Sequence, residues 1–256
     1  MNRNIAVVTG ASSGLGREYA RLLVQEPEVE EIWAIARDLR KLTQLKESLG
    51  DKIIPISLDL SRIDEIKKFQ DRLKEAQPRI VWMINNAGFA KLCDYGDLTI
   101  EESLNMIDLN CGGIVAMALA CIPYMPQGSH MLNTASQAAF QPLPFQNLYS
   151  STKAFVRNYS RALNVELKVK GITVTAVCPG WMDTALFDRA KIGAERATRR
   201  FVGMVTPDKV AQKALTDAKK GRDISVYSLY VKMAHLTAKL LPQRMMMKIW
   251  LKQQGL

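Results

Sequence analysis

Short apolar runs alternate with longer amphipathic segments along almost the whole chain, and this alternation limits the possible folds more than any other feature. The short runs have the length of buried strands, whereas the segments between them carry apolar residues at helical spacing. Parallel strands require crossover connections, and right-handed crossovers place helices on both faces of a sheet. We therefore expect an α/β fold with a doubly wound, mostly parallel sheet in a single domain.

The expected strands are Ile5–Val8, Ile32–Ala36, Ile53–Ser57, Val81–Asn85, Met131–Thr134, Thr173–Val177 and Ile224–Tyr227. The expected helices are Gly14–Gln25, Leu39–Leu49, Ile63–Ala76, Glu101–Tyr124, Tyr149–Val169 and Pro207–Lys219. An eight-fold α/β barrel is the rival layout, but it needs eight strand–helix repeats, and its phosphate-binding loops usually come late in the chain. An open sheet of about seven strands is therefore favoured.

The composition is that of a soluble globular protein, with 48% apolar residues in a chain of 256. The four cysteines lie far apart without a C-x-x-C pair, and only two histidines could join them. We therefore expect reduced thiols, no metal site and a cytoplasmic protein. The first expected strand begins close to Met1, which leaves no room for a secretory leader.

The formal net charge of +10 is concentrated at the C-terminal end. From Ser228 to Leu256 the chain holds five cations and no acid, is rich in Met and Leu, and is interrupted by Pro242. We expect residues 229–256 to form two short helices, a basic extension of the domain that residues 1–228 make. This extension is expected to cover a cleft or contact a partner subunit; the alternative is weak contact with an anionic membrane. The rest of the chain is only mildly basic, so no nucleic-acid partner is expected.

A glycine-rich segment, Thr9 to Gly16, lies between the first expected strand and the first expected helix. Glycines let the backbone turn sharply and approach a pyrophosphate, and a helix N-terminus offers free N–H groups with a partial positive charge. Its G-x-x-x-G-x-G spacing differs from the G-x-G-x-x-G fingerprint of many dehydrogenases. The position of the segment nevertheless predicts a dinucleotide site on a Rossmann-type sheet.

This segment resembles the T-G-x-x-x-G-[IL]-G loop of the short-chain dehydrogenase/reductase family. The resemblance continues at Asn85-Asn86-Ala87-Gly88, which is similar to the family's N-N-A-G, and at Pro179-Gly180 with Thr184, which is similar to its P-G-x-x-x-T. Family membership implies an oxidoreductase that moves a hydride between a nicotinamide cofactor and a carbonyl or secondary alcohol. The resemblance implies the catalytic set Asn110, Ser136, Tyr149 and Lys153. The implied cofactor-binding residues are Gly10, Ser12, Ser13, Gly14, Leu15, Gly16, Arg37, Asp59, Leu60, Asn86, Ala87, Gly88, Tyr149, Lys153, Pro179, Gly180 and Thr184.

The end of the second expected strand favours NADP(H) over NAD(H). NAD enzymes place an acid there for the ribose 2′-hydroxyl, whereas NADP enzymes place a basic residue nearby for the 2′-phosphate. Here Ala36 stands at the position of the acid, and Arg37, a fork-shaped cation suited to phosphate, follows it. Many family members also carry a basic residue before the second glycine, where this chain has Ser13. Ser12, Ser13 and Arg40 are possible helpers.

Tyr149 and Lys153 are four residues apart on an expected helix, so they project from one face a turn apart. An adjacent ammonium stabilises a phenolate, and we therefore expect Lys153 to lower the pKa of Tyr149. Tyr149 would then exchange the proton of the substrate oxygen. The resemblance implies that Ser136 donates a hydrogen bond to that oxygen, that Lys153 reaches the nicotinamide ribose, and that Asn110 holds a water linking Lys153 to solvent.

Apolar residues border the expected substrate cleft and predict a bulky apolar substrate that is steroid-like, acyl or aromatic. They are Ala138, Ala139, Phe140, Leu143, Pro144, Phe145, Trp181, Met182, Leu186 and Phe187. The family often pairs subunits through the helices corresponding to Glu101–Tyr124 and Tyr149–Val169, which implies a homodimer or homotetramer. The alternative is an NADPH-binding regulatory protein without turnover, although intact Ser136, Tyr149 and Lys153 argue against it.

Overall fold

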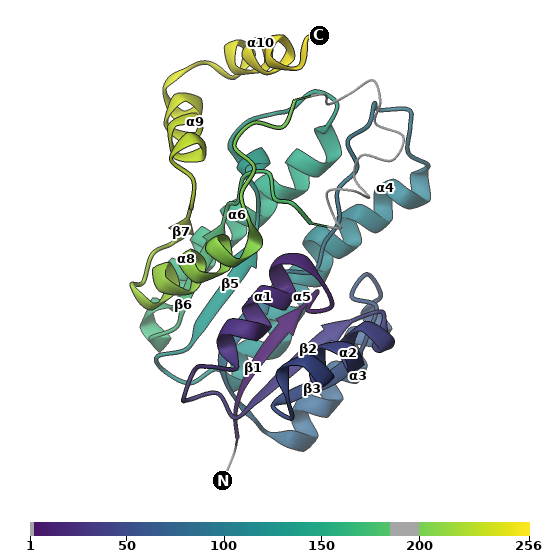
Figure 1. Cartoon of the computed structure of the whole chain (residues 1–256), viewed down its shortest axis with the longest axis vertical. Coiled ribbons are helices and arrows are strands. Elements are labelled where there is room, and N and C mark those ends of the chain that lie inside the picture. Colours follow the sequence, from purple (N-terminus) through teal and green to yellow (C-terminus); the bar gives the residue numbers. More distant parts are fainter. Residues whose placement is uncertain (1–2, 185–199) are drawn as a thin grey trace.

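The computed structural model describes residues 3–184 and 200–256. Within these residues the centre is a parallel seven-stranded sheet with the order β3-β2-β1-β4-β5-β6-β7 (Figure 1). The strands are β1 (Asn4–Thr9), β2 (Glu31–Ala36), β3 (Ile53–Ser57), β4 (Arg79–Asn85), β5 (His130–Thr134), β6 (Thr173–Val177) and β7 (Ile224–Ser225). The chain adds β2 and β3 on one side of β1 and then crosses to add β4 on the other. The doubly wound sheet is thereby confirmed, and the switch point between β1 and β4 is where such sheets bind ligands.

Helices cover both faces of the sheet. One face carries α1 (Gly14–Leu23), α2 (Leu39–Leu49) and α8 (Pro207–Lys219), and the other carries α3 (Ile63–Ala76), α5 (Ile114–Cys121) and α6 (Asn147–Leu167). Successive side chains of a strand point to opposite faces, so β1 contributes Ile5 and Val7 to one core and Ala6 and Val8 to the other. The alternation of apolar runs and amphipathic segments is therefore explained by two cores separated by one sheet.

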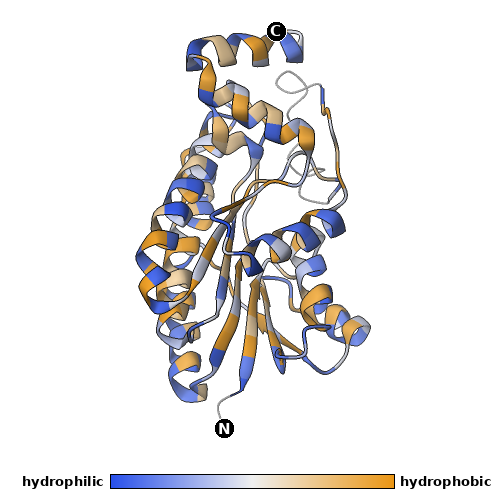
Figure 2. Cartoon of the chain, turned by 90° about the vertical axis from the view of Figure 1, so that its left-hand side faces the viewer, coloured by the Kyte–Doolittle hydropathy of each residue, from blue (hydrophilic) through white to orange (hydrophobic). Residues whose placement is uncertain are grey.

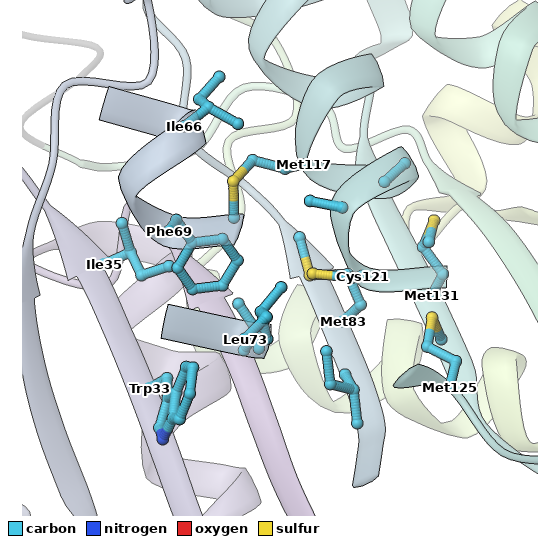
Figure 3. Packing of buried hydrophobic residues seen from close by; sticks show 14 of the residues in the cluster. Trp33, Ile35, Ile66, Phe69, Leu73, Met83, Met117, Cys121, Met125 and Met131 are labelled. Carbon is cyan, nitrogen blue, oxygen red and sulfur yellow. The ribbon is translucent and has the colours of Figure 1, made fainter. Parts of the chain in front are cut away.

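Figure 3 shows the core beneath α3 and α5, where aromatic and sulfur-containing side chains fill the space above the sheet. Phe69 of α3 packs edge-to-face on Trp33 of β2, with ring centroids 6.0 Å apart. Met117 and Cys121 belong to the same buried cluster and come from α5. This packing holds α5 and the segment before it against the sheet.

The expected helix Glu101–Tyr124 is not one α-helix. It consists of α4 (Ile100–Ile107), a π-helical turn at Asp108–Gly113, α5, and a 3₁₀ turn at Ile122–Tyr124. Gly113 explains part of the irregularity, because a Cβ atom there would lie 2.7 Å from the carbonyl oxygen of Leu60. Widened π turns occur mostly at functional sites, and this one carries Asn110.

Other element boundaries differ from expectation by a few residues. β7 ends at Ser225 instead of Tyr227, and α6 begins at Asn147, two residues before Tyr149. Tyr149 therefore lies inside the first turn of α6, where the helix is already formed. Among the described residues, the run Ile100–Tyr124 alone is long and apolar enough to cross a membrane, with a mean hydropathy of 1.7, and half of it is buried inside the molecule.

The C-terminal segment forms two helices, α9 (Leu229–Leu240) and α10 (Gln243–Gln254), separated at Pro242 as expected. They lie at the end of the molecule opposite the N-terminus (Figures 1 and 2). α9 contacts the body through Val231, which belongs to a buried cluster with Ala135 and Val156. The His235 ring also packs on Phe140 in a tilted arrangement, with centroids 3.9 Å apart and an interplanar angle of 36°.

Candidate active site

A cavity of about 1490 Å³ opens at the carboxyl ends of the strands. The residues that follow the first six strands contribute to its wall: Gly10, Arg37, Leu58, Asn86, Ala135 and Pro179. Sixteen of the seventeen expected cofactor-binding residues line this cavity, and Gly16 is the exception. The structure therefore brings together side chains from nearly the whole length of the described chain.

The glycine-rich loop leaves the N-terminus of α1 open toward the cavity. Gly10 and Gly14 have φ angles of +66° and +52°, which side chains rarely adopt. Gly16 is buried instead, and a Cβ atom there would lie 2.1 Å from the carbonyl oxygen of Gly10, so its role is to let α1 approach the loop. Ser13 precedes α1 and makes no side-chain cap, which leaves N–H groups of the first turn available for an anion. This cradle fits the pyrophosphate of a dinucleotide.

Thr9 joins the glycine-rich loop to the segment after β4. Its Oγ1 accepts hydrogen bonds from the backbone N–H groups of Asn86 (2.9 Å) and Ala87 (3.0 Å). The side-chain amide of Asn86 in turn donates to the carbonyl oxygen of Thr9 at 3.3 Å. These bonds fix the two sides of the cradle relative to each other.

The end of the cavity next to β2 and β3 carries both cations and carboxylates. Arg37 is exposed and lines the cavity, and so does Lys41 on the first turn of α2. Asp38 lies between them, but its carboxylate accepts from the backbone N–H of Lys41 at 3.3 Å and caps α2. Arg40 does not line the cavity; its guanidinium lies 4.0 Å from Asp38. Lys41, rather than Arg40, is therefore the second cation at this end.

Asp59 also lines this end of the cavity. Its carboxylate accepts hydrogen bonds from the backbone N–H (3.0 Å) and the hydroxyl (2.7 Å) of Ser61. This turn fixes the direction of the backbone after β3 and places Leu60 in the cavity wall.

At the end of the cavity next to β5 and α6, the wall contains Ser136, Tyr149 and Lys153. Lys153 is 4% exposed, and its ammonium donates to the carbonyl oxygen of Thr134 at 2.8 Å and lies 5.8 Å from the centroid of the Tyr149 ring. Burial lowers the pKa of Lys153 to about 8.

The pKa of Tyr149 moves opposite to the direction expected from the sequence. Burial raises it, and a side-chain hydrogen bond with Ser136 acts in the lowering direction but is the smaller effect. The expected lowering by Lys153 is not found, because removal of the phenol from water outweighs the other influences. Tyr149 is therefore held in its neutral, protonated form.

Asn110 is fully buried on the π-helical turn and does not line the cavity. Its side-chain oxygen accepts from the backbone N–H of Phe89 at 3.0 Å, and its amide donates to the carbonyl oxygen of Phe89 at 2.9 Å. The amide also donates to the Thr152 hydroxyl on α6 at 3.2 Å. Asn110 thus clamps the segment after Gly88 onto the helix that carries Tyr149 and Lys153.

The substrate end of the cavity is only partly as expected. Ala138, Phe140, Leu143, Trp181 and Met182 line it. The prediction is wrong for three other residues, which do not line it: Ala139, Pro144 and Phe145. Ala139 packs in the core beneath α9, and Pro144 turns its carbonyl oxygen to the Trp250 indole. Leu186 and Phe187 lie outside the described residues.

α10 closes this end of the cavity. Trp250 is 8% exposed and belongs to a buried cluster with Ala138 and Leu143, against which Tyr149 and Trp181 pack. Its indole N–H donates to the carbonyl oxygen of Pro144 at 3.1 Å. Gln254 accepts from the backbone N–H of Arg200 at 3.0 Å. Of the roles expected for the C-terminal extension, covering the cleft is the one that these contacts support.

A family model for short chain dehydrogenases matches residues 4–194, which is most of the chain. The chain belongs to the short-chain dehydrogenase family. An uncharacterized oxidoreductase of Staphylococcus aureus is 32% identical to it over 185 residues, covering 71% of this chain and 79% of that protein. An uncharacterized oxidoreductase of Staphylococcus epidermidis is 28% identical over 198 residues, covering 77% and 85%. The expected family and enzyme class are confirmed: the protein is an oxidoreductase.

Solved structures of short-chain dehydrogenases share this fold. One from Sphingobium yanoikuyae, in complex with NADPH, has a TM-score of 0.78 and 27% identity and covers 95% of both chains. One from Burkholderia phymatum, in complex with NAD, has a TM-score of 0.79 and 20% identity and covers 93% of this chain and 95% of that one. Because these two structures hold different nicotinamide cofactors, the shared fold does not decide between NADP(H) and NAD(H).

Several residues of this dehydrogenase site were not singled out from its sequence. Thr9 could have been predicted, because it opens the glycine-rich motif. Lys41 could have been predicted as well, because it lies one helical turn beyond Arg37. Nothing local in the sequence indicates the cavity-lining side chains of α9 and α10. These are Tyr230, Met233, Ala234, Thr237, Met246, Ile249, Trp250, Gln253 and Gln254.

Proposed function

We propose that this dehydrogenase is an NADP(H)-dependent enzyme that interconverts a bulky, mainly apolar ketone and its secondary alcohol. The observation that carries the proposal is the meeting of Ser136, Tyr149 and Lys153 in one cavity with an open phosphate cradle. The nicotinamide would supply or accept the hydride when bound. The residues that hold it would be those of the glycine-rich loop, the segments after β2, β3 and β4, and the Pro179–Thr184 region.

Tyr149 is the proton donor in the direction of reduction. Tyrosine has an ordinary pKa of about 10 and burial raises that of Tyr149 further, so the side chain is a phenol at neutral pH and can give its proton to the substrate oxygen. Ser136 donates a hydrogen bond to that oxygen as negative charge develops on it. Lys153, with a pKa of about 8, is mostly charged at neutral pH and stabilises the phenolate left on Tyr149.

Asn110 acts as a positioning residue in this proposal. Its two hydrogen bonds to Phe89 and its bond to Thr152 hold the cofactor-facing backbone at a fixed distance from α6. Its expected second role, holding a water that links Lys153 to solvent, stays a prediction. The π-helical turn supports the positioning role of Asn110, because it directs the amide toward Phe89 instead of continuing the regular helix.

The proposed preference for NADP(H) rests on Arg37 and Lys41. Both line the end of the cavity next to β2 and β3, where the adenosine ribose would lie, and Arg37 is exposed. A phosphate between a guanidinium and an ammonium gains charge-assisted hydrogen bonds.

The proposed substrate class rests on the apolar side chains beside Tyr149. Leu143 and Trp250 belong to one buried cluster against which Tyr149 and Trp181 pack, so a substrate that reaches Tyr149 touches mostly apolar carbon. Such a wall gives little binding to sugars or compact acids, because their polar groups would lose water without gaining partners.

The proposed assembly is a homodimer or homotetramer of a cytoplasmic protein. Ile100, Leu104, Ile107 and Leu119 form an exposed apolar line along α4 and α5. Phe155 and Val165 are exposed on the neighbouring α6. An apolar surface of this kind over two adjacent helices suits a partner subunit. The four free thiols fit a reducing compartment, and residues 229–256 act as an extension of the same domain.

The test is to follow NADPH consumption with a panel of steroids, acyl thioesters, quinones and small aldehydes. We expect the highest kcat/KM with a bulky apolar ketone. A clear preference for the small aldehydes would refute the substrate class. Tight NADPH binding without turnover on any member of the panel would instead support the alternative, a regulatory NADPH-binding protein.

A further inference from the structure

One face of α9 is apolar and exposed. Leu229, Met233, Leu236 and Leu240 have exposed fractions of 74%, 55%, 48% and 73%. Their spacing of four, three and four residues places them on one side of the helix, and we call them the α9 stripe. Four large apolar side chains in a continuous line at the surface indicate a contact beyond the chain itself.

Cations border the α9 stripe and continue onto α10. Lys232 and Lys239 are seven residues apart and therefore lie along one edge of the stripe. On α10, Arg244, Lys248 and Lys252 are exposed and four residues apart, whereas Trp250, on the other side of that helix, is buried over the cavity. No acidic residue occurs between positions 228 and 256. The outer surface of both helices is therefore positively charged and partly apolar.

The other edge of the α9 stripe borders the cavity. Tyr230, Ala234 and Thr237 line the cavity, and Met233 belongs both to the cavity wall and to the stripe. If another surface is bound to the α9 stripe, a molecule that leaves that surface would reach the cavity wall without passing through bulk water. Figure 2 shows both helices at the end of the molecule opposite the N-terminus.

We propose that α9 and α10 dock on the surface of an anionic lipid bilayer. The α9 stripe enters the boundary between headgroups and acyl chains, and the five cations contact lipid phosphates, as in basic amphipathic helices that lie in the membrane interface. The cavity then opens beside the bilayer, where an apolar substrate would be dissolved. The docking itself does not depend on the proposed activity; only the delivery of substrate rests on it.

A second copy of this chain is a less suitable occupant. Two such surfaces brought face to face would place two groups of five cations together without an acid in either tail. Like charges at short distance repel, and here no carboxylate from the partner tail compensates. An anionic bilayer offers phosphates to the five cations and acyl chains to the α9 stripe.

The test is sedimentation of the full chain with vesicles of phosphatidylcholine alone or mixed with an equal amount of phosphatidylglycerol. We expect binding to the mixed vesicles that weakens as salt rises, because salt screens exposed charges. The variant Leu236→Glu/Leu240→Glu should bind at least about tenfold more weakly, since two carboxylates would enter the interface. The variant Arg244→Gln/Lys248→Gln/Lys252→Gln should also lose at least about tenfold, since each cation near an anionic surface contributes separately.

The matched control is Ile63→Glu/Val169→Glu, which introduces the same charge at apolar side chains that are 61% and 90% exposed on α3 and on the turn after α6. It should bind like the unmodified chain, and circular dichroism should show all variants folded. The proposal is overturned if the unmodified chain does not bind mixed vesicles, or if the control loses as much as the stripe variant. It is also overturned if size exclusion shows an oligomer that the stripe variant alone dissociates, because a second copy would then occupy this surface.

Discussion

Trp250→Ala should detach α10 from the cavity and change which substrates react. Trp250 is 8% exposed and shares a buried cluster with Leu143, against which Tyr149 and Trp181 pack, and its indole N–H donates to the carbonyl oxygen of Pro144 at 3.1 Å. Truncating a buried tryptophan typically costs about 3 to 5 kcal/mol. Because α10 is no part of the sheet and can leave without unfolding it, we expect this cost to fall on its docking.

A docking loss of about 3 kcal/mol corresponds to roughly a hundredfold shift from docked to free helix. Two consequences follow at the site. A bulky apolar substrate loses one wall, so its kcat/KM should fall by at least about tenfold, whereas a small aldehyde should be affected less. Tyr149 becomes more exposed, so its pKa should fall toward its ordinary value, because burial is the main cause of the rise.

The assay is kcat/KM for one bulky ketone and one small aldehyde, together with protease sensitivity of the C-terminal segment. Trp250→Phe retains much of the apolar contact and should give a smaller change. Leu240→Ala, at a side chain that is 73% exposed, is the matched tail control and should leave both substrates unchanged. An unchanged ratio of the two kcat/KM values in Trp250→Ala would refute α10 as a wall of the substrate site.

Three further perturbations test other parts of the account. The unmodified protein should prefer NADPH over NADH by roughly ten- to hundredfold in Kd at fixed salt, since an Arg–phosphate contact contributes about 1.5 to 3 kcal/mol, and Ala36→Asp/Arg37→Gln should reverse that preference. Equal Kd values for both cofactors in the unmodified protein would contradict this. The kcat for reduction should fall as pH rises through about 8, where buried Lys153 loses its proton, and Lys153→Arg should move that decrease to higher pH. If the decrease stays at the same pH in Lys153→Arg, Lys153 is not the group that causes it. Tyr19→Phe should raise Tm by about 2 to 4 °C, because the buried Tyr19 hydroxyl has no hydrogen-bond partner among the described residues; a lower Tm would show that the hydroxyl is satisfied.

The fold was predictable because its signals are local. The apolar run Ile5–Val8 lies within β1 (Asn4–Thr9), and the expected strand Thr173–Val177 matches β6 without change. The same holds for the phosphate cradle, since Gly10 and Gly14 are needed where the backbone adopts a positive φ. The roles of such residues are determined by their neighbours in the sequence.

The features that escaped prediction depend on contacts between distant residues. The π-helical turn carries Asn110, whose hydrogen bonds with Phe89 are not revealed by hydrophobic spacing along a helix. Trp250 reaches the site only because α10 folds back onto Pro144, more than a hundred residues earlier. The pKa of Tyr149 was expected to fall because the pairing with Lys153 was visible in the spacing, whereas the burial that dominates it was not.

The central claim is that Tyr149 gives the proton when a ketone is reduced at this site. The most direct measurement is steady-state NADPH oxidation with the best ketone of the panel, compared between the unmodified protein and Tyr149→Phe, with the NADPH Kd determined for both. We expect an unchanged Kd and a kcat lowered by at least about a hundredfold, the usual scale for losing a positioned acid. A kcat within a few-fold of the unmodified protein would contradict the account, because another group would then be supplying the proton.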